Sequence, residues 1–120
     1  MHYAVFEKWL DETMRRGIPE NVSALNFNLY EDGEDLWSAE LVGTESFDPD
    51  DSDWACDEIF DNRETPLSRN EEADWETILS KVQGIVEEYL QKGTYAQQLR
   101  QYRGIGVGFV EGDIELVYVK

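Results

Sequence analysis

Apolar residues recur every three or four positions between residues 75 and 90, which is typical of an amphipathic helix with one buried side. The repeating residues are Trp75, Ile78, Leu79, Val82, Ile85, Val86, Tyr89 and Leu90. Ser68 followed by Glu71 fits a capping box near the start of this segment, and Gly93 marks its end. A helix of this kind is stable only when its apolar side is covered, so the rest of the chain must supply a packing surface.

A second helical pattern lies at the N-terminus, over residues 3–16. The apolar positions with helical spacing are Val5, Phe6, Trp9, Leu10 and Met14. Arg15 and Arg16 suit the negative end of the helix dipole, Gly17 follows them, and Pro19 prevents continuation.

Alternating segments predict the strands. Leu25, Phe27 and Leu29 share one face of a first strand, and Trp37, Ala39 and Leu41 share one face of a second, with a turn at Asp32-Gly33 between them. Residues 105–109 and 114–118 form a second predicted hairpin around Glu111-Gly112, and a further strand is possible over 54–60. We therefore expect a single domain over residues 1–120, of α+β class. Its antiparallel sheet would have four or five strands in two hairpins, with the N-terminal and the long central helix packed on one face.

Negative charge is concentrated in one part of the chain. The 120 residues carry a formal net charge of −17, and residues 31–64 hold 14 acidic residues against Arg63 alone, which is −13 of that total. Like charges at close range repel and do not help folding, whereas a field of one sign steers an oppositely charged partner. The charge pattern therefore predicts a basic protein as the partner.

The residues that we expect to contact this partner lie in the first hairpin turn and in the loop after the second strand. They are Glu31, Asp32, Glu34, Asp35, Asp48, Asp50, Asp51 and Asp53, with Trp54 as an aromatic anchor. Tryptophan is enriched among the residues that dominate interface energies, often inside a polar rim.

Several functions are disfavoured by composition. A phosphate backbone or an anionic membrane repels a chain of this charge, and no apolar run approaches the roughly 20 residues that span a bilayer. The chain has one histidine, His2, and one cysteine, Cys56, which we expect to be a buried structural thiol. We therefore expect a cytoplasmic protein without enzymatic activity or cofactor.

The acidic hairpin is followed by Trp54-Ala-Cys-Asp-Glu-Ile-Phe60, the long helix and Gly108-Phe-Val-Glu-Gly-Asp-Ile-Glu-Leu-Val-Tyr118. This order resembles the small cytosolic immunity proteins encoded beside bacterial polymorphic toxins. The resemblance implies tight binding to, and inhibition of, a toxin domain, often a basic nuclease.

Two alternatives remain open from the sequence. One is a nucleic-acid mimic that regulates a DNA-binding protein, which differs only in its partner. The other is a small domain that binds a divalent cation or hydrolyses a substrate. Residues 48–53 begin like a calcium loop, although Asp53 stands where glycine is required and Ile59 where the bidentate glutamate belongs.

Overall fold

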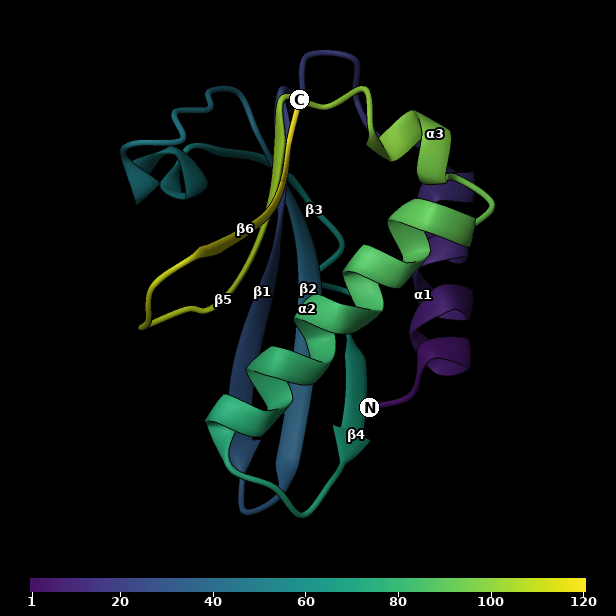
Figure 1. Ribbon diagram of the computed structural model, residues 1–120, viewed down its shortest axis with the longest axis vertical. Helices are drawn as coiled ribbons and strands as arrows, with labels where there is room; N and C mark the ends of the chain where they lie inside the picture. Colours follow the sequence, from purple (N-terminus) through teal and green to yellow (C-terminus); the bar gives the residue numbers. More distant parts are fainter.

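The computed structural model describes residues 1–120 and has an α+β fold, in which helices cover a mixed sheet (Figure 1). In chain order the elements are α1 (Tyr3–Arg16), β1 (Ala24–Gly33), β2 (Leu36–Thr44), the 3-10 turn η1 (Ser52–Cys56), β3 (Glu58–Asp61), β4 (Leu67–Asn70), α2 (Trp75–Lys92), α3 (Ala96–Leu99), β5 (Gly104–Phe109) and β6 (Glu115–Val119).

The sheet has six strands, and its direction corrects the prediction of an antiparallel sheet. The order is β3-β2-β1-β5-β6, and β4 pairs with β2 beyond the end of β3. β1 and β5 are parallel, with Phe27 opposite Val107, while every other pair is antiparallel. A parallel pair requires a long crossover, which the chain provides because α2 lies between β4 and β5. Periodicity reveals a strand but carries no information about its direction.

The β1–β2 hairpin turns two residues later than the sequence suggested. Gly33 pairs with Leu36, so the turn consists of Glu34 and Asp35 rather than Asp32-Gly33. Asp35 takes the left-handed conformation with φ of 57°. A register shift between Glu31 and Gly33 accounts for the displaced turn.

Helices α1 and α2 cover the same face of the sheet. Phe6 and Leu10 of α1 and Val82 of α2 are fully buried in one cluster with Phe27 and Leu41 of the central strands. None of the helices has the length and apolarity that a membrane-spanning helix requires.

The start of α2 differs from the predicted capping box. Ser68 lies in β4 and pairs with Ser38 of β2, because the free edge of β2 offers a row of hydrogen-bonding groups. Asp74 is the N-cap instead, and its Oδ1 accepts a 2.8 Å hydrogen bond from the backbone N–H of Thr77.

The other face of the sheet carries a small aromatic layer instead of a helix. Phe47 and Trp54 pack edge to face, with ring centroids 5.0 Å apart, beside Ala24. A Cβ at Gly104 would lie 2.2 Å from the Phe47 ring, so glycine permits this close approach.

Candidate functional site

The predicted acidic residues separate into two groups in the folded chain. Glu31, Asp32 and Glu34 are exposed at the tip of the β1–β2 hairpin, and Asp35 beside them is half-buried. Asp48, Asp50, Asp51 and Asp53 are exposed in the segment that leads from β2 into η1. The nine residues of β2 separate the two groups by roughly 30 Å at a strand rise of about 3.3 Å per residue. The tip and the loop therefore lie toward opposite ends of the molecule, as Figure 1 shows.

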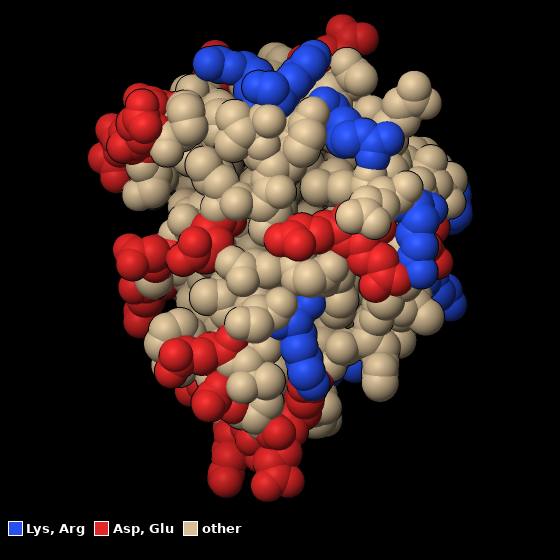
Figure 2. Space-filling model, viewed as in Figure 1, with Lys and Arg blue, Asp and Glu red and all other residues tan.

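Acidic residues that the sequence analysis did not single out lie between these groups. The β5–β6 turn and the first residue of β6 carry the exposed residues Glu111, Asp113 and Glu115. In Figure 2, Asp and Glu follow the side of the molecule that runs from the η1 segment past the β5–β6 turn to the hairpin tip, while Lys and Arg gather mainly at the top and on the opposite side. The sequence does show three acidic residues within positions 111–115, but this segment lies outside residues 31–64, where the negative charge is most concentrated.

We refer to this surface as the acidic edge. It consists of Glu31, Asp32, Glu34, Asp48, Asp50, Asp51, Asp53, Glu111, Asp113 and Glu115. None of these carboxylates makes an ion pair. Two of them instead order the loop, because Asp48 and Asp51 accept hydrogen bonds from the backbone N–H groups of Asp50 and Asp53.

The predicted aromatic anchor is wrong, because Trp54 is only 4% exposed and its ring packs against Phe47. Trp37 is also buried, and its Nε1 donates a 2.9 Å hydrogen bond to the carbonyl of Glu71. The exposed tryptophan is Trp75, at 52%, in the first turn of α2. Helical spacing assigned Trp75 to the buried stripe, but the spacing within one helix cannot show which turns of the stripe the rest of the chain covers.

A groove surrounds Trp75 where the first turns of α2 meet the β5–β6 turn. Its volume is about 460 Å³, and its lining includes Trp75, Glu76, Leu79, Phe109, Asp113 and Glu115. The groove therefore combines an exposed indole with two members of the acidic edge.

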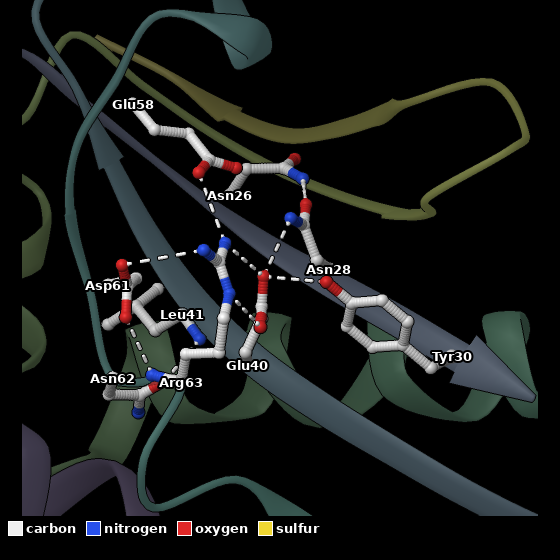
Figure 3. Close-up of polar contacts among 9 residues, drawn as sticks. All are labelled: Asn26, Asn28, Tyr30, Glu40, Leu41, Glu58, Asp61, Asn62 and Arg63. Carbon is white, nitrogen blue, oxygen red and sulfur yellow. Dashed lines mark hydrogen bonds and ion pairs between the residues drawn. The ribbon is translucent and has the colours of Figure 1, made fainter. Parts of the chain in front are cut away.

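Other acids of the 31–64 stretch are used inside the fold. Glu40 of β2 is 3% exposed, and Arg63 binds it through two hydrogen bonds, from Nε to Oε2 at 3.0 Å and from Nη2 to Oε1 at 2.9 Å (Figure 3). The same guanidinium group also contacts Glu58 at 3.1 Å and Asp61 at 3.6 Å. These three acids are paired with the only base of the stretch, and the buried Glu40 is not accessible to a partner.

The Glu40 carboxylate also accepts hydrogen bonds from the Tyr30 hydroxyl at 2.8 Å and from Asn28 Nδ2 at 3.2 Å. Burial acts to raise the pKa of Glu40, but the hydrogen bonds from Arg63, Tyr30 and Asn28 together outweigh it and hold the pKa below its ordinary value. Burial and the hydrogen bond to Glu40 raise the pKa of Tyr30 to about 12.

A second hollow, of about 390 Å³, lies over the outer face of β1 between η1 and the β5–β6 turn. Asn26 lies at its floor and is 1% exposed; its Nδ2 donates to Asn28, and its Oδ1 has no partner. Cys56 on the rim is exposed, which corrects the expectation of a buried thiol, because η1 turns this side chain outward. No group of three or more His, Cys, Asp and Glu side chains is arranged to hold a metal ion.

Comparison of the chain with protein-family models, with curated proteins and with solved structures finds no match.

Proposed function

We propose that this protein is a non-enzymatic cytoplasmic inhibitor that binds a basic toxin domain, of the nuclease class, through the acidic edge. The observation that carries the proposal is the set of ten carboxylates without ion pairs along one side of the molecule. Their mutual repulsion disfavours the compact state, and a cationic partner would remove it. The resemblance of the sequence to immunity proteins of polymorphic toxins supports the same class of partner.

The length of the acidic edge fits one protein interface. An interface of standard size covers about 800 Å² of each partner, which corresponds to a patch about 30 Å across. The hairpin tip and the η1 segment are separated by roughly that distance. One basic partner can therefore contact both groups and the β5–β6 turn between them, as a nuclease contacts successive phosphates along its substrate.

The two groups lie farther apart than the Debye length of about 8 Å at physiological ionic strength. Each group therefore attracts its own part of the partner, and the loss of one group should weaken binding without abolishing it.

The proposal is tested on the partner recovered by cross-linking from the source organism, with association followed by stopped-flow kinetics. We expect the association rate to fall at least tenfold between about 0.1 M and 1 M salt, over which the Debye length shortens from about 10 Å to about 3 Å. We also expect the partner's nuclease activity to be blocked in the complex.

The decisive comparison uses two variants of equal net charge. One is the tip variant Glu31→Gln/Asp32→Asn/Glu34→Gln, and the other is the control Glu12→Gln/Glu20→Gln/Glu87→Gln, which neutralises three exposed acids outside the acidic edge. The tip variant should associate several-fold more slowly than the control. Equal rates for the two variants, or a rate that does not change with salt, would contradict the proposal. If the cross-linked partner is a host DNA-binding protein and not a toxin, the protein is a nucleic-acid mimic.

A further inference from the structure

The groove around Trp75 differs from the rest of the acidic edge because it offers an aromatic surface in a fixed orientation. The Trp75 and Phe109 rings meet edge to face at 89°, with centroids 6.1 Å apart. Phe109 in turn contacts the buried ring of Trp37, with centroids 5.9 Å apart. This row of rings leads from the surface into the core, so the exposed indole is held by packing and loses little freedom when a ligand binds.

The residues that line the groove favour a positively charged ligand. Leu79 and Phe109 supply apolar contacts, and the carboxylates of Glu76, Asp113 and Glu115 supply negative charge. Neither Lys nor Arg lines the groove, and none of the three carboxylates makes an ion pair within the chain. Its volume of about 460 Å³ is sufficient for one long side chain.

We propose that this groove receives an arginine side chain of the basic partner. The planar guanidinium group stacks on the Trp75 indole, and its N–H groups donate to the carboxylates of Glu76, Asp113 and Glu115. Arginine fits better than lysine, because a guanidinium group stacks on an aromatic face and reaches two carboxylates at once, whereas an ammonium group is a compact and strongly hydrated charge. A second copy of the chain is an unsuitable occupant, since two molecules of net charge −17 repel each other.

This inference rests on the proposed function and adds the residue that anchors the partner. Trp75 would be the central aromatic contact, and the tip and the η1 segment would form the surrounding charged rim.

The test uses hexa-arginine and hexa-lysine peptides as probes, with affinities measured by isothermal titration calorimetry. We expect the wild-type protein to bind hexa-arginine about three- to tenfold more tightly than hexa-lysine, from the usual strength of a cation–aromatic contact. Trp75→Ala should remove this preference. The control Val119→Ala, which truncates another half-exposed apolar side chain outside the groove, should retain it. Persistence of the arginine preference in Trp75→Ala would overturn the inference.

A second measurement on the wild-type protein does not depend on the folding of a variant. Trp9, Trp37 and Trp54 are at most 7% exposed, so acrylamide quenches mainly the fluorescence of Trp75. Bound hexa-arginine should reduce this quenching. Unchanged quenching at saturating peptide would show that the cation binds elsewhere and that the groove is not its site.

The failure of this inference can be distinguished from the failure of the proposed function. If only the groove is wrong, hexa-arginine still binds more weakly to the tip variant than to its control, while the Trp75 substitution has no effect. If only the proposed function is wrong, the peptide still protects Trp75 from acrylamide, while no basic partner depends on the hairpin tip.

Discussion

Removing the guanidinium group of Arg63 should destabilise the fold far more than its exposed position suggests. The change is Arg63→Met, which keeps most of the aliphatic stem. The substitution affects the Glu40 carboxylate, which is 3% exposed and would lose two hydrogen bonds and its countercharge. Oε2 of Glu40 would then have no donor, because Tyr30 and Asn28 both donate to Oε1.

The magnitude follows from the geometry of the pair. Hydrogen bonds to charged groups contribute about 1.5–3 kcal/mol each, and breaking a fully buried ion pair costs about 3–5 kcal/mol. The Arg63 side chain is 51% exposed, so water can partly replace it. We therefore expect a loss of about 2–3 kcal/mol in the free energy of unfolding, measured by urea denaturation at neutral pH. Arg69→Met removes an exposed arginine of β4 that makes no ion pair, and it should change stability by less than about 0.5 kcal/mol.

The double variant with Glu40→Gln and the pH dependence test the cause. If the buried carboxylate is the reason for the loss, the two changes should be non-additive by about 1–2 kcal/mol. The hydrogen bonds to Glu40 keep its pKa in the folded protein below the ordinary value of 4.5, so its stabilising effect is complete above that value and disappears as the pH falls through the folded-state pKa. The difference between wild type and Arg63→Met should therefore shrink in acid. Additive changes, or a difference that stays the same at low pH, would refute this reasoning.

Three further predictions concern the outer face of the sheet and the central helix. Gly104→Ala should destabilise the protein by about 1–3 kcal/mol, because the new Cβ would lie 2.2 Å from Phe47. Gly84→Ala in α2 should stabilise it by about 0.5–1 kcal/mol, because the new Cβ would meet no atom of another part of the chain within 4 Å. Thermal denaturation measures both changes. Tyr30 should stay protonated up to about pH 12, so the stability that it contributes is complete below its ordinary pKa of 10 and is lost as the pH rises toward 12. The tyrosinate absorbance is titrated in the wild type and in Tyr30→Phe, and the difference between the two curves belongs to Tyr30. If the midpoint of that difference curve lies near pH 10, the hydrogen bond to Glu40 is not retained in solution.

Residues close together in the sequence determined much of this fold. The spacing of Phe6, Trp9 and Leu10 is sufficient to define α1 over Tyr3–Arg16, and the apolar stripe from Trp75 defines α2. Strand alternation likewise identified which side of β1 faces the main core, since Leu25 and Phe27 lie in it. Such patterns depend on residues two to four positions apart, which share one face of a strand or a helix whatever the rest of the fold is.

Contacts between distant residues decided what the patterns could not show. Parallel pairing of β1 with β5 depends on how α2 returns the chain, and β4 forms because the edge of β2 needs a partner. Contacts between distant residues also explain why Trp54 is buried and Trp75 is exposed, the reverse of what the sequence predicted. Trp54 is buried because Gly104 lets Phe47, against which it packs, approach the sheet closely. Trp75, in the first turn of α2, remains 52% exposed with its ring packed against Phe109 at the end of β5. Burial is a property of the assembled surface, so the sequence determined that the chain is acidic, and only the tertiary structure decided which aromatic ring those charges surround.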